Sequence, residues 1–177
     1  MRILLIITCL ANIVFAFGSL PWMPEQVANH FDLDGVPNRF MSPIVNAMLL
    51  SVTTGFMGAI ILGVSYLMAF STKHMPELVN IPNRDYWMNE ENRPKTVRRL
   101  CVNVEFIGVS TMLFMLLLQW ELFRANQMVP PKLEGNSLWV GTGVLLVVIT
   151  IDIVRMLLSF RLPKTESQDH VENTPPI

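Results

Sequence analysis

The stretch ILLIITCLANIVFAFGSL, residues 3–20, contains no charged side chain and is long enough to cross a lipid bilayer. A transmembrane helix needs roughly 20 mostly apolar residues to cross a hydrocarbon core of about 30 Å. Similarly apolar runs follow at Ile44–Phe70, Leu100–Trp120 and Leu138–Phe160. Over the chain, 51% of residues are hydrophobic, only 15% are charged, and the mean hydropathy is +0.43. The sequence therefore predicts an all-α membrane protein with four transmembrane helices.

The first run has a second interpretation, as a secretory signal peptide. A signal core contains about 7 to 15 apolar residues, and this run is longer. The residues before Pro21 also fit a small-residue cleavage site poorly, because Phe17 is bulky. An uncleaved transmembrane helix is therefore favoured.

Basic residues are distributed unevenly between the gaps. The gap after the first run holds only Arg39, whereas the gap after the second holds Lys73, Arg84, Arg93, Lys95, Arg98 and Arg99. Lys and Arg mark the cytoplasmic side of a membrane protein. Both termini and the middle loop are therefore expected in the cytoplasm, in a bacterial cytoplasmic (inner) membrane.

This orientation divides the chain into four expected parts. Residues 1–71 form a first helical hairpin, with a short folded extracytoplasmic segment at 21–43 between its helices. Residues 72–99 form a basic cytoplasmic loop, and residues 100–161 form a second helical hairpin. Residues 162–177 are polar and end in prolines, which favours a disordered cytoplasmic tail.

The second run contains small residues at every fourth position: Ala47, Ser51, Gly55, Ala59 and Gly63. Small residues allow helix backbones in a membrane to approach closely. The pattern predicts that this side of the helix packs against another helix or another copy of the chain.

Three ionisable residues interrupt the last two runs: Glu105, Asp152 and Arg155. Such groups are costly in a bilayer and usually face the protein interior. We expect an ion pair between Arg155 and one of the carboxylates. Two alternatives stay open, namely a proton or ion relay and an Arg155 that extends to the head groups. Asn12, Asn46 and Asn103 are expected to form hydrogen bonds between helices.

The outer gap, LPWMPEQVANHFDLDGVPNRFMSP, concentrates the candidate functional residues. We expect Pro24 to open a short helix with Val27 and Phe31 on its apolar face. Asp34-Gly35 and Pro37 then predict a turn. His30 could bind metal or respond to pH beside Asp32, but a structural capping turn is favoured, since two ligands are too few for zinc.

This segment resembles the signature of a bacterial membrane family known as domain of unknown function 1648. The matching positions are Leu20, Pro21, Val27, His30, Phe31, Gly35, Pro37 and Phe40. Asp32 departs from the pattern, which tends to have Asn there. The better understood relatives are the SdpI-type proteins, and the resemblance implies a role in immunity to a secreted toxin and in signalling its presence.

No Walker motif, GxGxxG, HExxH or GxSxG occurs in the chain. We therefore expect a non-enzymatic sensor, immunity or accessory protein with no catalytic residues, metal or cofactor. The candidate ligand-binding residues are His30, Phe31, Asp32, Gly35 and Pro37. Expected partners are the lipid bilayer, a second copy or another membrane protein, and an envelope peptide or small ligand outside, but no nucleic acid. The alternative is a membrane enzyme or ion-coupled transporter that uses His30 or the Glu105, Asp152 and Arg155 group.

Overall fold

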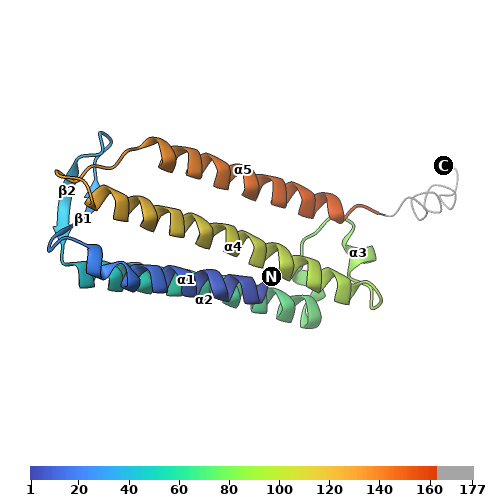
Figure 1. The fold of residues 1–177 in the computed structure, drawn as a ribbon. Coiled ribbons are helices and arrows are strands. Elements are labelled where there is room, and N and C mark those ends of the chain that lie inside the picture. The colour runs from blue at the N-terminus through green and yellow to red at the C-terminus, as the bar shows by residue number, and fades with distance from the viewer. Residues whose placement is uncertain (163–177) are drawn as a thin grey trace, which may run out of the picture.

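The computed structural model describes residues 1–162, which form a bundle of four long helices (Figure 1). These helices are α1 (Arg2–Gly18), α2 (Pro43–His74), α4 (Arg93–Asn126) and α5 (Asn136–Ser159). Each is long and apolar enough to cross a membrane, so the fold class predicted from the sequence is confirmed. Of the expected tail at 162–177, everything after Leu162 lies outside the described residues.

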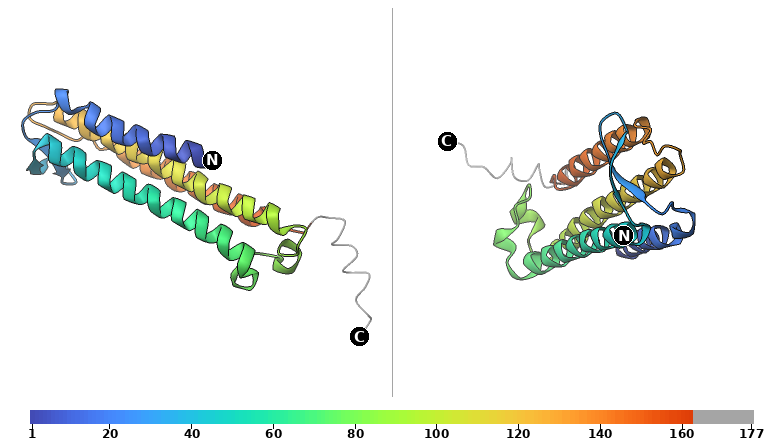
Figure 2. Two further views of the ribbon diagram at one scale, coloured as in Figure 1. Left: turned by 90° about the horizontal axis from the view of Figure 1, so that it is seen from below. Right: turned by 90° about the vertical axis from the view of Figure 1, so that its left-hand side faces the viewer.

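Helix α4 is the centre of the bundle, because it packs against α1, α2 and α5 (Figure 2). Its buried residues Glu105, Met112, Gln119 and Asn126 recur every seven positions, which places them on one side of the helix. Leu5 of α1 completes a small apolar core with Met112. In contrast, within residues 1–162 no side chain of α5 is buried. Helix α5 is therefore the least enclosed of the four.

Helix α1 is much shorter than its neighbours, with 17 residues against 32 in α2 and 34 in α4. Its first residue lies part of the way along the bundle, and α2 and α4 continue beyond it (Figures 1 and 2). We call the end of the bundle with α3 (Arg84–Trp87) the loop end, and the end with strands β1 (Val27–Phe31) and β2 (Pro37–Met41) the hairpin end.

The connection at the loop end is folded and shorter than the predicted loop at 72–99. Helix α2 continues to His74 and α4 begins at Arg93, so only residues 75–92 connect them, through the 3-10 turn η2 (Pro76–Leu78) and α3. Trp87 is buried, and its indole N–H donates a hydrogen bond of 2.8 Å to the carbonyl oxygen of Phe160. The hydroxyl of Thr96 donates to the carbonyl of Trp87 at 2.8 Å. The first bond attaches the connection to the end of α5, and the second attaches it to the start of α4.

The segment between α1 and α2 contains a β-hairpin where the sequence suggested a helix opened by Pro24. After the 3-10 turn η1 (Leu20–Trp22), strand β1 pairs antiparallel with β2, and Val27 lies opposite Met41. The expected helix is therefore wrong. An isolated helix of a few residues is unstable in water, whereas pairing with a strand only a turn away satisfies the same backbone groups.

One buried polar contact joins α1 to α4, as the sequence predicts for Asn12. The side-chain amide of Asn12 donates to the carbonyl of Met112 at 3.0 Å, and its oxygen accepts from the amide of Gln119 at 2.8 Å. The pairing stabilises the helix contact, since a buried amide without a partner is costly.

Candidate functional site

Asp32 organises the turn between the strands. Its backbone N–H donates to the carbonyl of Val36 at 2.9 Å. Its side-chain Oδ1 accepts from the backbone N–H of Asp34 at 3.0 Å and from that of Val36 at 2.8 Å. An aspartate that binds backbone groups two residues later is a common turn former. The residue type at position 32 therefore has a structural role through an oxygen that Asn would also provide.

Gly35 is required for two reasons. Its φ of +76° lies in the left-handed region, where residues with a Cβ are strained. Its carbonyl also accepts from the backbone N–H of Leu133 at 3.0 Å, and a Cβ at this position would overlap the carbonyl oxygen of Leu133. Leu133 precedes α5, so the turn is held against the connection between α4 and α5.

Asn126, at the end of α4, fixes the other side of the hairpin. Its Oδ1 accepts from the backbone N–H of Ala28 at 2.7 Å, and its amide donates to the carbonyl of Ala28 at 2.9 Å. The side chain thus pairs with β1 in the way a neighbouring strand would. Sequence reasoning missed this residue because an asparagine at a helix end carries no signal for a partner almost one hundred positions away.

His30 is placed on the exposed side of β1, opposite β2. Its ring Nδ1 lies 2.6 Å from Oδ1 of Asn38. The sequence placed His30 beside Asp32, whereas in the structure its partner is the side-chain amide of Asn38 on the other strand. Phe31 and Pro37 face each other at the end of the same ladder.

A pocket of about 280 Å³ opens between the hairpin turn and the start of α5. Asp32, Asp34 and Gly35 form one wall, and Trp139 with Thr142 forms the opposite wall. Leucines complete the lining, at Leu33, Leu118, Leu133 and Leu138. Two acidic residues and a tryptophan therefore line one largely apolar pocket. Of the five predicted ligand-binding residues, Asp32 and Gly35 line this pocket, and sequence reasoning did not find Trp139.

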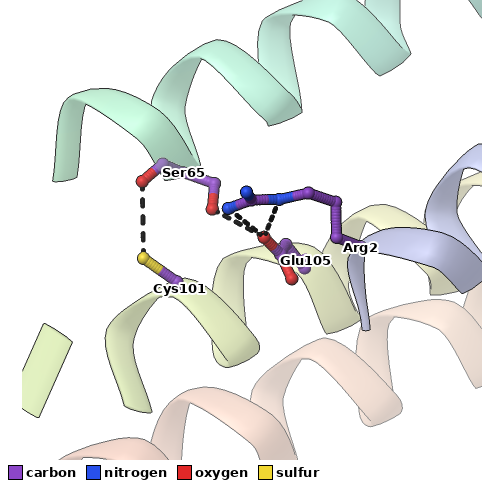
Figure 3. Close-up of polar contacts among 4 residues, drawn as sticks. All are labelled: Arg2, Ser65, Cys101 and Glu105. Carbon is purple, nitrogen blue, oxygen red and sulfur yellow. Dashed lines mark hydrogen bonds and ion pairs between the residues drawn. The ribbon is translucent and has the colours of Figure 1, made fainter. Parts of the chain in front are cut away.

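Glu105, Asp152 and Arg155, which the sequence predicted to cluster, lie in two places. Glu105 is directed toward α1 and α2, whereas Asp152 and Arg155 lie on α5. Glu105 is buried and pairs with Arg2, whose Nη2 lies 2.9 Å from its Oε1 (Figure 3). The Ser65 hydroxyl donates to the same oxygen at 2.9 Å, and the Cys101 thiol donates to the carbonyl of Ser65 at 3.4 Å.

The expected pairing of Arg155 with a carboxylate is therefore not found among residues 1–162, where the ion pairs are Arg2–Glu105 and Arg124–Glu121. Helix α4 directs Glu105 toward α1 and α2, whereas α5 packs on the side of α4 that carries Phe114 and Leu117. Arg2 was missed because its position at the start of the first run gave no indication of depth.

The small-residue pattern of α2 does not form a packing face within the described chain. Ala47 is buried, but Gly55, Ala59 and Gly63 are exposed, and nothing lies within 4 Å of a Cβ added to Gly55 or Gly63. A helix turns about 100° per residue, so steps of four advance by about 40° each and leave the starting face. Close approach occurs instead at Gly58, where an added Cβ would lie 2.5 Å from Sγ of Cys9.

These features define a multi-pass membrane protein in which the connection between the first two long helices is a fixed β-hairpin. Residues 4–55, from α1 through the hairpin into α2, match the family described as "Domain of unknown function (DUF1648)". The resemblance noted in the sequence is thus confirmed for this part of the chain.

One curated relative is an uncharacterized protein of Archaeoglobus fulgidus, which is 28% identical over 112 residues. The match covers 56% of this chain and 61% of the relative, so the chain spans about three-fifths of that protein's length. No solved structure matches the chain.

Proposed function

We propose that this protein is a non-enzymatic sensor, immunity or accessory protein of a bacterial cytoplasmic membrane, and that it binds a positively charged peptide or amine outside the cell. The hairpin end faces outward in this proposal, and both termini and the loop end face the cytoplasm. The concentration of Lys and Arg between the second and third helices supports this orientation.

The pocket between the hairpin turn and α5 carries the proposal. Asp32 and Asp34 supply negative charge, and Trp139 supplies an aromatic face, which attracts cations electrostatically. The leucine lining favours a ligand whose charged group is attached to an apolar or extended chain. A cationic peptide side chain or a small organic amine combines these properties.

The pocket also provides a route for a signal. One wall belongs to the hairpin, which Asn126 and Leu133 hold in place, and the other belongs to α5. Within residues 1–162, no side chain of α5 is buried and its main neighbour is α4, so α5 can shift without disturbing the packing of α1 against α2. A ligand that bridges the two walls would change the position of α5 relative to α4. That movement would reach the loop end, where Phe160 contacts the folded connection.

The second candidate function is a membrane enzyme or ion-coupled transporter. No contact of the described residues favours it, since the His30 ring bonds Asn38 and the three ionisable residues do not meet. Residues 1–162 contain no group of three or more His, Cys, Asp or Glu side chains arranged to hold a metal ion.

The test is a binding titration followed by tryptophan fluorescence, with the protein in nanodiscs of zwitterionic lipid. Tetralysine is the probe, and tetraglutamate is the control for charge. We expect tetralysine alone to change the emission, and Trp139→Phe to remove that change while the other three tryptophans remain.

The matched variants are Asp32→Asn and Asp34→Asn, because Asn at 32 keeps the oxygen that binds the turn. Each should weaken tetralysine binding at least fivefold, on the order of 1 kcal/mol per lost charge. Asp85→Asn, an exposed acid at the loop end, should leave binding unchanged. Tetralysine binding that is absent, or equal in Asp32→Asn and the parent protein, would refute a cationic ligand at this pocket.

A further inference from the structure

A cavity of about 630 Å³ lies between α4 and α5 at the loop end. Three arginines line it, Arg98 and Arg99 of α4 and Arg155 of α5. Asp152 and Asn103 add polar atoms, and Val102, Phe106 and Met156 add apolar surface. This is a separate space from the outer pocket, at the opposite end of the bundle.

The length of α1 places this cavity at the membrane boundary. The segment Arg2–Trp22 contains 21 residues, or about 32 Å at roughly 1.5 Å per residue, which matches a hydrocarbon core of about 30 Å. Arg2 therefore lies near one boundary, and Glu105, bonded to it, lies at the same level. Met1 lines the cavity. The cavity thus opens at the level of the lipid head groups.

The arginines are arranged to receive an anion. Arg99 is held in place, because its Nη1 donates to the carbonyl of Ser159 at 2.8 Å and its guanidinium lies 4.6 Å from the centre of the Trp87 ring. Arg98 and Arg155 are exposed, and neither forms an ion pair within residues 1–162. Guanidinium groups bind phosphate through paired N–H donors, so three around one space suit a phosphate group.

Asp152 requires the opposite kind of partner, a hydrogen-bond donor. Its Oδ2 is buried and accepts no hydrogen bond within residues 1–162. Arg155, three residues further along α5, does not reach ion-pair distance of it among the described contacts. A buried carboxylate oxygen without a donor is costly, so this position favours a ligand that carries a donor. The cavity therefore combines two arginines, Arg98 and Arg155, that have no ion-pair partner within residues 1–162 with a carboxylate oxygen of Asp152 that has no hydrogen-bond donor.

We propose that this cavity binds a phosphate ester that also carries a protonated amine, with the phosphate on Arg98, Arg99 and Arg155 and the amine on Asp152. The head group of an aminophospholipid, such as phosphatidylethanolamine, has this chemistry and lies at this level of the bilayer. Basic pockets between transmembrane helices on the cytoplasmic side are a known form of lipid head-group site. A soluble phosphate ester with an amine has the same recognition chemistry, and the experiment separates the two sources.

The experiment measures lipid affinity by native mass spectrometry of the detergent-solubilised full chain. Phosphatidylethanolamine, phosphatidylglycerol and phosphatidylcholine are added separately, and soluble O-phosphoethanolamine is added in a fourth series. We expect phosphatidylethanolamine to bind tightest, because it alone among the three lipids offers both a phosphate and an ammonium N–H.

Variants of the cavity residues test which charged side chains bind the phosphate and which binds the amine. Arg98→Gln and Arg155→Gln should each weaken phosphatidylethanolamine binding about fivefold, equivalent to about 1 kcal/mol per basic residue. Asp152→Asn should remove the preference over phosphatidylglycerol while phosphatidylglycerol itself still binds. Lys95→Gln is the matched control, since Lys95 is exposed, carries the same charge and does not line the cavity.

Each remaining outcome contradicts a defined part of the proposal. Equal affinity for the three lipids, or equal losses in Lys95→Gln and Arg98→Gln, would overturn it and leave only general attraction between basic residues and lipid. An unchanged preference in Asp152→Asn would overturn the role of the amine. Soluble O-phosphoethanolamine binding as tightly as the lipid would overturn the lipid as the source. Circular dichroism of each variant, compared with the parent protein, identifies any loss that comes from misfolding.

Discussion

The hairpin end and the loop end of the bundle solve the same problem, closure of a helix bundle at a membrane surface, by different means. At the hairpin end, hydrogen bonds to backbone groups fix the strands and the turn, as in the pairing of Asn126 with Ala28, of Gly35 with Leu133, and of the Asp32 carboxylate with the turn N–H groups. At the loop end, Trp87 and Phe160 hold the connection, and Asp152, Arg98 and Arg155 nearby have no ion pair within residues 1–162.

At each end, the contacts that fix the backbone can be distinguished from the charged side chains that the end displays. Backbone hydrogen bonds and a glycine at positive φ hold the hairpin in one conformation, so the acidic side chains of Asp32 and Asp34 are displayed from a fixed base. The loop end is held by Trp87 and Phe160, and its charges remain available around a cavity. We infer that the hairpin end recognises a ligand by shape and negative charge, and that the loop end interacts with anionic groups.

The two ends should differ completely in their access from outside the cell. In a chain with Cys9 and Cys101 replaced by alanine, Leu33→Cys should react with a membrane-impermeant maleimide added to intact cells. Glu90→Cys should react only after the cells are opened, because the basic loop end is expected inside. Both positions are exposed, so accessibility alone does not distinguish them. Labelling of Glu90→Cys in intact cells would reverse the orientation of the whole comparison.

Gly35→Val should cause the largest loss of stability at the hairpin end. Valine is strained at φ of +76°, and its Cβ would overlap the Leu133 carbonyl. We expect a loss of about 3 kcal/mol or more in the free energy of unfolding, measured in detergent with denaturant. Asp34→Ala should change it by less than about 0.5 kcal/mol, because Asp34 contributes only its backbone N–H to the turn. Similar losses in both variants would show that the backbone does not fix this end.

Gly58→Leu should cost more than Gly55→Leu, although the sequence pattern selects Gly55. At Gly58 the added side chain meets Cys9 on α1, and overpacking of this kind costs about 1 to 3 kcal/mol. At Gly55 the side chain meets open space, so the free energy of unfolding should change by less than about 0.5 kcal/mol. A greater loss for Gly55→Leu would indicate contact with another copy of the chain through the small-residue stripe.

The smallest effect is expected at the ion pair between Arg2 and Glu105. A double-mutant cycle with Arg2→Gln and Glu105→Gln should give a coupling energy of at most about 1 kcal/mol, since the Arg2 side chain is 58% exposed. The matched cycle of Arg155→Gln with Glu105→Gln should give no coupling. Coupling confined to the second pair would restore the pairing expected from the sequence and refute the assignment of Glu105 to α1.

Several features followed from the sequence because they depend on local composition. The four apolar runs predicted four helices, since a bilayer requires long apolar segments whatever their neighbours. The turn at Gly35 followed from glycine chemistry, which is local too. The segment at 27–31 was misassigned as a helix because Val27 and Phe31, four apart, share a face in a short helix and in a strand alike.

The sequence by itself thus determined the membrane class, the number of helices, the position of the turn and the asymmetry of basic residues. The tertiary structure alone decided the partners: Asn38 for His30, Ala28 for Asn126, Arg2 for Glu105, and Cys9 opposite Gly58. It also brought Trp139 and Asp32 to one pocket, and Arg155 and Arg98 to one cavity. The physical reason is that hydropathy depends only on the residues within a segment. A contact between helices depends on the rotation and relative depth of two segments, and a difference of one residue rotates a side chain by about 100° around its helix.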